Sequence, residues 1–279
     1  MTEHRPAAPL LVLGSTGKLG QILRKHWKDR KDVIWQGRKP VAGVTLVWSE
    51  GDGLEVLPPV RAVVALWGVV PGAGGDLEDN ARLAQLAMRI ASAPRAPRVL
   101  HCSSAAIYRP GPAPLTENDP PEPQTPYGRA KLAMEEAVRD WRAQNATPPA
   151  ACLMRIGNVI GADSLFAAMA TADRTGRSVT LDRFGDGQGP RRSYLSGADL
   201  ARCLEALSEC PLRDLPEVVN LAGHRAVAMA DLARHASHIP QWREAPPEAA
   251  PLVELGTGRL RSLLDLGPES GTAPHLMAD

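Results

Sequence analysis

The stretch LLVLGSTGKLG at residues 10–20 decides the fold of this chain. Residues 10–13 form a short apolar run typical of a buried strand, and the chain then passes through Gly14, Gly17 and Gly20 into a helical pattern. Glycines let the backbone turn tightly and let a ligand approach it closely, and the N–H groups at a helix start favour an anion. Strand, turn and helix together predict that a dinucleotide binds here through its pyrophosphate.

The expected contacts of the pyrophosphate are the seven residues of this turn, Gly14, Ser15, Thr16, Gly17, Lys18, Leu19 and Gly20. The turn is not a P-loop, because Leu19 rather than a serine or threonine follows Lys18. A tight turn that binds no ligand is the alternative interpretation of the same glycines.

Further apolar runs alternate with helical patterns along the chain, at residues 33–35, 44–48, 62–67, 99–102, 151–156 and 218–221. Such alternation predicts βαβ units, and nearly continuous apolar strands suit a parallel sheet that is covered on both faces. We expect helices over residues 76–93 and 127–145, where Leu, Ala and Met recur at spacings of three and four. The predicted fold is therefore α/β, a doubly wound parallel sheet of the Rossmann type.

Two departures from this pattern predict the domain organisation. Residues 109–126 contain seven prolines, so they must form a loop, and a loop of this length is often a binding wall. Beyond residue 160 the regular alternation fails. We therefore expect a dinucleotide-binding domain made of residues 1–160 and 196–224. Residues 161–195 and 225–279 are expected to form a smaller, C-terminal substrate-binding lobe.

The composition excludes several classes of protein. The 279 residues include 32 Lys and Arg against 31 Asp and Glu, so no broad positive field favours nucleic acid. The longest apolar stretch, at residues 62–70, is too short to cross a bilayer, and the N-terminus has no signal-peptide pattern. The protein is therefore expected in the cytoplasm, without membrane partners. Its four cysteines lie far apart and predict no metal site.

The region after the second expected strand bears on the choice of dinucleotide. In NAD-selective folds an acidic residue there binds the ribose 2′-hydroxyl, whereas an arginine accommodates the 2′-phosphate of NADP. This chain offers Gln36, Gly37 and Arg38 and no carboxylate. Arg38, helped by Lys18, can pair with that phosphate through its planar guanidinium. The sequence thus favours NADP over NAD, and a solvated loop position for Arg38 is the alternative.

A tyrosine and a lysine supply the predicted chemistry. Tyr127 and Lys131 are four residues apart on an expected helix, so they project from one face. A neighbouring ammonium favours the phenolate, which should draw the tyrosine pKa down toward neutrality, where it can exchange a proton with an alcohol or ketone. Ser104 follows an expected strand and can hydrogen-bond the same oxygen. These three are the expected catalytic residues.

The order of these pieces resembles the extended short-chain dehydrogenase/reductases, the NAD(P)-dependent epimerase/dehydratase family. The resemblance covers almost the whole chain and rests on GSTGKLG at 14–20, ALWG at 65–68, Asn80, SSAAIY at 103–108, YGRAK at 127–131, RIGNVIG at 155–161, RSYLSGADL at 192–200 and VVNLAG at 218–223.

The resemblance implies a role for each site residue. It makes Tyr127 the proton-transferring group, with Lys131 holding the nicotinamide ribose and Ser104 positioning the reacting oxygen. It places the other residues in two groups, the cofactor groove with Leu66, Trp67, Gly68 and Ile156, and the substrate side with Ser104, Asn158 and Arg192. It also implies a homodimer.

Departures from the family pattern limit the substrate. Ala105 and Ala106 stand where dehydratases of nucleotide-linked sugars have an Asp-Glu pair, so a 4,6-dehydratase is disfavoured. The tail lacks the family's Arg-rich segment for a diphosphate, so a small sugar-like substrate suits the chain as well as a nucleotide-linked sugar. An epimerase that retains NAD and a reductase that consumes NADPH both remain open. A catalytically silent, NAD(P)-sensing regulator is the alternative from another class.

Overall fold

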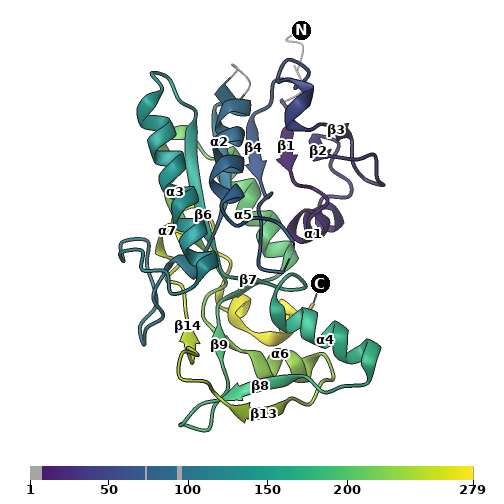
Figure 1. Cartoon of the computed structure of the whole chain (residues 1–279), viewed down its shortest axis with the longest axis vertical. Helices are drawn as coiled ribbons and strands as arrows, with labels where there is room; N and C mark the ends of the chain where they lie inside the picture. Colours follow the sequence, from purple (N-terminus) through teal and green to yellow (C-terminus); the bar gives the residue numbers. More distant parts are fainter. Residues whose placement is uncertain (1–7, 73, 93–95, 279) are drawn as a thin grey trace.

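The computed structural model describes residues 8–72, 74–92 and 96–278, and its main sheet has seven parallel strands (Figure 1). The strands are β1 (Leu10–Leu13), β2 (Val33–Gly37), β3 (Leu46–Val47), β4 (Ala62–Ala65), β5 (Arg98–Ser104), β6 (Ala150–Ile156) and β11 (Val218–Leu221). Their order is β11-β6-β5-β4-β1-β2-β3. The chain winds outward in both directions from the β1/β4 pair, where strand ends open a crevice for a ligand. The predicted doubly wound fold is confirmed.

Helices cover both faces of the sheet. They are α1 (Lys18–His26) and α5 (Gly197–Glu209) on one face, and α2 (Asp79–Ser92) and α3 (Pro126–Gln144) on the other. Burial on both faces explains why the sequence of β1 is apolar throughout. Leu10 and Val12 belong to the core with α1 and α5, whereas Leu11 and Leu13 belong to the core with α2 and α3. A strand buried on both sides has no solvent-facing position for a polar residue.

A second group of elements, which we call the small lobe, lies below the sheet in Figure 1. It comprises α4 (Ser164–Thr175), β8 (Thr180–Arg183), β9 (Arg191–Arg192), β12 (Val227–Ala228), α6 (Met229–His235), β13 (Gln241–Glu244), β14 (Leu252–Val253) and α8 (Ala273–Leu276). Strand β13 pairs with β8, and β9 lies between β12 and β14. Leu165, Met169, Leu181 and Leu232 belong to a separate apolar core here. The division of the chain by residue number stays a prediction.

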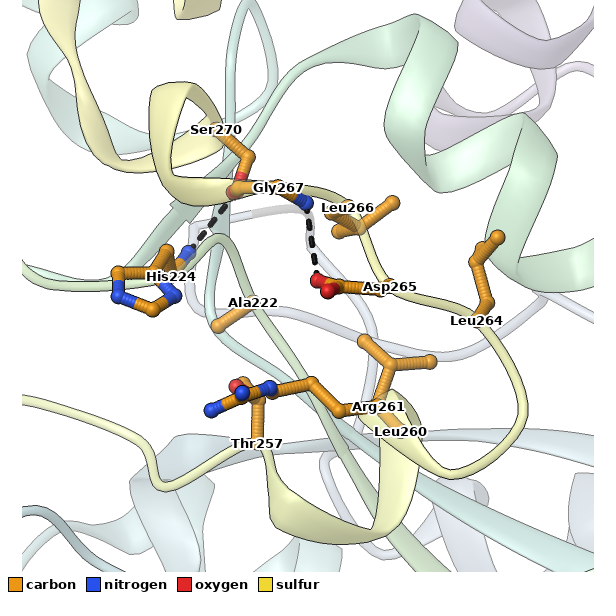
Figure 2. A pocket seen from close by; sticks show the side chains of 10 residues that line it. All are labelled: Ala222, His224, Thr257, Leu260, Arg261, Leu264, Asp265, Leu266, Gly267 and Ser270. Carbon is orange, nitrogen blue, oxygen red and sulfur yellow. Dashed lines mark hydrogen bonds between the residues drawn. The ribbon is translucent and has the colours of Figure 1, made fainter.

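Two short strands, β7 (Asn158–Val159) and β10 (Tyr194–Leu195), pair with each other where the chain leaves and re-enters the main domain. The C-terminal segment then returns to the main sheet. Helix α7 (Gly258–Arg261) lies against β11, and Leu260 and Leu266 join the core on the α1/α5 face. Figure 2 shows how the following turn is fastened, since the backbone N–H of His224 donates to Ser270 Oγ at 3.0 Å.

The observed elements differ in length from those the sequence predicts. The strand expected at 44–48 is reduced to Leu46–Val47, and the one expected at 62–67 ends at Ala65. The second difference has a visible cause. The Asn80 side chain accepts a hydrogen bond from Val69 N and donates one to Val69 O, so this segment is tied to the first turn of α2 instead of continuing the strand. The proline-rich stretch is a loop as predicted, up to the start of α3 at Pro126.

In the part of the chain that the structure describes, no helix is both long enough and apolar enough to span a bilayer. Within the same residues, His, Cys, Asp and Glu side chains do not gather in a group that could hold a metal ion.

Candidate active site

The glycine-rich turn is held against β2 and β4. Gly14 has φ +77°, and a Cβ there would lie 2.7 Å from the backbone nitrogen of Trp67, so only glycine fits. The N–H of Gly14 donates to Gln36 Oε1 at 3.0 Å, and the N–H of Ser15 donates to Gln36 O at 3.1 Å. Gln36 therefore fixes the turn from β2, a role the sequence did not indicate.

A groove of about 780 Å³ opens beside this turn along the carboxyl edge of β1, β2 and β4. Seven of the predicted cofactor residues line it, namely Gly14, Thr16, Gly17, Arg38, Leu66, Trp67 and Gly68. The groove continues past Arg38 to Glu50 and Arg82, which pair with each other. Predicted residues from three separate parts of the sequence thus meet at one site.

The remaining predicted cofactor residues lie around this groove. Ser15 and Gly20 are buried under the turn, and a Cβ on Gly20 would meet the Ser15 backbone at 2.5 Å. Leu19 packs on the α1/α5 core, as does Ile156, which neighbours Ser104 in the sheet register. These residues shape the turn and the floor of the site.

Lys18 differs from its predicted role as a helper of Arg38. Its Nζ donates to the carbonyl of Ala162 at 3.0 Å, so the side chain reaches toward the segment that leads into α4. Lys18 is the first residue of α1, whereas Arg38 follows β2. The two residues therefore belong to different elements beside the turn.

The residues present fit a dinucleotide. Gly17 caps α1 without a side-chain hydrogen bond, so the first-turn N–H groups are available to an anion at the positive end of the helix. Gly17 also brings no side chain into the groove, and Arg38 is exposed at its far end. The turn would hold the pyrophosphate, and the Arg38 end would hold the adenosine.

The predicted catalytic residues come together at the carboxyl end of β5. Ser104 is the last residue of β5, and its hydroxyl hydrogen-bonds the Tyr127 side chain from α3. Lys131, one turn further on, has its Nζ 5.8 Å from the centre of the Tyr127 ring. That Nζ donates to Cys102 O at 2.9 Å. Tyrosine, lysine and serine therefore form one cluster, as the sequence predicts.

The electrostatics of this cluster differ from expectation. Burial raises the pKa of Tyr127 above its ordinary value, Cys102 adds to the rise, and the hydrogen bond with Ser104 opposes it. Burial also lowers the pKa of Lys131, against the pull of Cys102 and Glu135. The predicted lowering of the tyrosine pKa is therefore wrong for this structure, because desolvation by burial outweighs the hydrogen bond with Ser104. The phenol keeps its proton at neutral pH.

Gly68 brings the cofactor groove up to this cluster. A Cβ on Gly68 would lie 2.8 Å from Asn80 Oδ1 and 3.2 Å from Lys131 Nζ. The segment that follows β4 therefore passes directly beside Lys131. A dinucleotide laid from the glycine-rich turn across Gly68 would reach Lys131 and Tyr127 at its other end.

On the predicted substrate side, the side chains are held by the protein itself. Asn158 Nδ2 donates to Asp163 Oδ2 at 3.1 Å, and the Tyr194 hydroxyl donates to the same oxygen at 2.5 Å. Burial raises the pKa of Asp163. Arg192 donates to the carbonyls of Ala250 and Pro251, which lead into β14. Sequence reasoning missed Asp163, although its position before a helical pattern is typical of an N-cap.

Comparison with known proteins shows the family of this chain. The model of the NAD dependent epimerase/dehydratase family matches residues 10–222, and the chain belongs to this family. It is an enzyme of the extended short-chain dehydrogenase/reductase type. The dTDP-6-deoxy-L-talose 4-dehydrogenase (NAD(P)(+)) of Kitasatospora kifunensis is 29% identical over 262 residues, covering 83% of this chain and 78% of the relative.

Solved structures agree in fold. MoeE5 in complex with UDP-glucuronic acid and NAD has a TM-score of 0.75 at 18% identity, covering 94% of this chain and 96% of that one. The UDP-N-acetylglucosamine 4-epimerase from Methanobrevibacter ruminantium M1 has a TM-score of 0.76 at 14% identity, covering 98% and 99%. The relatives named by activity are a dehydrogenase and an epimerase, and neither supports the alternative of a silent sensor.

Proposed function

We propose that this enzyme transfers hydride between NAD(P) and a carbinol or carbonyl carbon of a nucleotide-linked sugar, with Tyr127 moving the accompanying proton. The cluster of Ser104, Tyr127 and Lys131 at the end of the dinucleotide groove carries the proposal. The activities of the named relatives favour a nucleotide-linked sugar over the smaller substrates that the sequence left open. A homodimer in the cytoplasm stays a prediction.

The nicotinamide, when bound, supplies or accepts the hydride. In the reducing direction, the Tyr127 phenol donates its proton to the oxygen of the substrate carbonyl. Ser104 hydrogen-bonds both that oxygen and the phenol, and so holds the two groups next to each other for proton transfer. The Lys131 ammonium then faces the phenolate that forms. The raised pKa of Tyr127 keeps the phenol protonated at rest, which is the form that donates a proton when a carbonyl is reduced.

Asn158 and Arg192 are the proposed contacts on the substrate side. Each already has protein partners, Asp163 for Asn158 and the carbonyls before β14 for Arg192. We propose that Arg192 also faces the diphosphate of the substrate, because its guanidinium has more donors than the carbonyls occupy. The carbonyls of Ala250 and Pro251 would then hold the arginine in place.

The proposed function is tested with the purified protein and dTDP-6-deoxy-L-talose, with NAD⁺ or NADP⁺, by following the reduced cofactor at its absorbance near 340 nm. UDP-glucose and UDP-N-acetylglucosamine, followed for epimer formation, form the second arm. Turnover in either arm that is lost in Tyr127→Phe supports the proposal. Turnover that survives this substitution would refute the assigned proton path.

The preference for NADP rests on Arg38 and gives a first prediction. Arg38→Ala should raise the Kd of NADPH by about ten- to a hundredfold, because a charge-assisted bond to the 2′-phosphate is worth about 1.5–3 kcal/mol. The Kd of NADH should change less than about threefold. Titration of tryptophan fluorescence measures both constants, since Trp67 lines the groove. Lys39→Ala, the exposed neighbouring cation, is the matched control. An equal loss for both cofactors would show that Arg38 does not select the phosphate.

The pH dependence of carbonyl reduction gives a second prediction. Reduction needs the protonated Tyr127, and the raised pKa of this phenol keeps the proton in place at neutral pH. The lowered pKa of Lys131 means that its ammonium is lost first as the pH rises. In a profile measured from about pH 6 to pH 10, the kcat for reduction should therefore first stay level and then fall as Lys131 loses its proton. A profile that rises with pH would contradict this assignment.

A further inference from the structure

The helix that carries Tyr127 and Lys131 is fastened by a third residue on the same face. Tyr127, Lys131 and Glu135 stand at intervals of four on α3, and each meets β5. Tyr127 bonds with Ser104, Lys131 donates to Cys102 O at 2.9 Å, and Glu135 Oε1 accepts from Ser103 Oγ at 2.7 Å. Three consecutive residues of β5 thus each bond with one of three α3 residues that are spaced one turn apart.

Glu135 is fully buried and is held by a bidentate partner. Arg155 on β6 donates to its two carboxylate oxygens, from Nε at 3.0 Å and from Nη2 at 2.8 Å. Arg155 itself is 2% exposed. Arg139, which is more exposed, adds a bond of 3.1 Å from the solvent side. A planar guanidinium on a carboxylate fixes orientation as well as distance. The pair therefore sets the rotation and height of α3 on the sheet.

The hydrogen bonds of the pair also extend to the proline-rich loop. The third nitrogen of Arg155 donates to the Tyr108 hydroxyl at 2.8 Å, and this hydroxyl donates to Asn220 Oδ1 at 2.9 Å. Asn220 Nδ2 donates to Leu115 O at 2.8 Å, and Asn220 N donates to Glu117 at 2.8 Å. Leu115 and Glu117 belong to the proline-rich loop. One chain of bonds, buried as far as Asn220, thus joins α3 to that loop.

We propose that Glu135 and Arg155 are positioning residues that hold Tyr127 and Lys131 in reacting geometry, and that Tyr108 and Asn220 link this position to the proline-rich loop. The inference rests on the proposed function and deepens it. A buried ion pair is by itself weak evidence for stability, since an apolar pair of similar volume can replace it. What an apolar pair cannot reproduce is a negative charge one turn from the Lys131 ammonium.

The charges around Lys131 determine in which direction its pKa should change when Glu135 is replaced. The titratable groups facing Lys131 are Tyr127 and Glu135 on α3 and His101 and Cys102 on β5. Burial and Lys131 lower the pKa of His101 to about 3, so this histidine is neutral and stays so. Glu135 favours the protonated lysine and raises its pKa. Removing the Glu135 charge should therefore lower the pKa of Lys131.

The test uses Glu135→Gln, which keeps the side-chain shape. We expect kcat to fall by about ten- to a hundredfold, because small displacements of reacting groups have effects of this size. The KM for substrate and the Kd for dinucleotide should stay within about twofold. The Lys131 midpoint should fall by about one pH unit, measured by NMR of ¹³C-labelled lysine in a chain with six lysines, and the alkaline limb of kcat should move with it. Arg139→Ala is the matched control and should leave both readouts unchanged.

Two further variants separate positioning from stability. The double variant Glu135→Gln with Arg155→Met removes both buried charges, so it should regain Tm without regaining kcat. Should Glu135→Gln fail to fold, the double variant decides by the same readouts. Tyr108→Phe breaks the link to the loop and keeps the bonds between Glu135 and Arg155, so it should raise the substrate KM several-fold with little change in kcat.

Native kcat and a native Lys131 midpoint in Glu135→Gln, with only Tm lowered, would overturn the inference, as would an unchanged KM in Tyr108→Phe for its link to the loop. Absence of any turnover in the native protein would refute the proposed function instead. The NMR midpoint would still decide the role of Glu135, because it needs no activity.

Discussion

Tyr127→Phe should lower kcat by about a hundred- to ten-thousandfold, the usual contribution of a positioned proton-transfer group. The substitution removes one hydroxyl and keeps the ring that faces Lys131. Because the dinucleotide groove is lined by other residues, the Kd of the dinucleotide should change less than about twofold. Steady-state rates and fluorescence titration measure the two effects on the same preparation.

The loss in Tyr127→Phe is informative only if the fold is intact. Among the described residues, Ser104 is the one hydrogen-bond partner that shifts the pKa of this phenol. Because the substitution loses this single bond, we expect the Tm to change little. A fall in kcat with native Tm and native dinucleotide affinity would assign the proton to Tyr127. Retained turnover would show that a different group moves the proton.

Gly128→Ala should also abolish most activity, through geometry instead of chemistry. A Cβ at Gly128 would lie 2.1 Å from the carbonyl oxygen of Ala106 and 2.9 Å from the Pro123 side chain. The backbone of α3 must therefore move away from the short 3-10 helix at Ala105–Ile107. Overpacking of this kind costs about 1–3 kcal/mol of folding free energy, and displacement of Tyr127 should lower kcat by about a hundredfold.

Gly258→Ala is the matched control for this substitution. Gly258 is also in the first turn of a helix, α7, but a Cβ there meets nothing within 4 Å. We expect native kcat and a native or slightly raised Tm for this variant, since alanine favours helix over glycine. Equal behaviour of the two variants in kcat and Tm would show that the contact with Ala106 is not critical.

The sequence predicted the parts of this molecule that depend on local pattern. The apolar run at 10–13 and the glycines after it identified the dinucleotide turn, because each position there has a steric requirement that the sequence displays. Tyr127 and Lys131 were found by their spacing on a helix, and Ser104 by its place at a strand end. These residues meet because the carboxyl ends of parallel strands share one edge of the sheet.

Other features depend on long-range packing that no local pattern reveals. The strands of the small lobe, such as β9 and β14, are only two to four residues long and are defined by their partners instead of by periodicity. The pKa of Tyr127 was predicted in the wrong direction because spacing shows the lysine and does not show burial. The role of Glu135 was likewise hidden, since its buried partners Ser103 and Arg155 come from two strands, β5 and β6.

The return of the C-terminal segment to the main sheet affects how the chain is made. Strand β6 receives its neighbour β11 only after residue 221, and the α1/α5 core receives Leu260 and Leu266 later still. During synthesis from the N-terminus, the first 160 residues therefore emerge with an unpaired strand edge and an uncovered apolar face, both of which favour aggregation. Native folding of this domain therefore finishes only after Leu260 and Leu266 have left the ribosome.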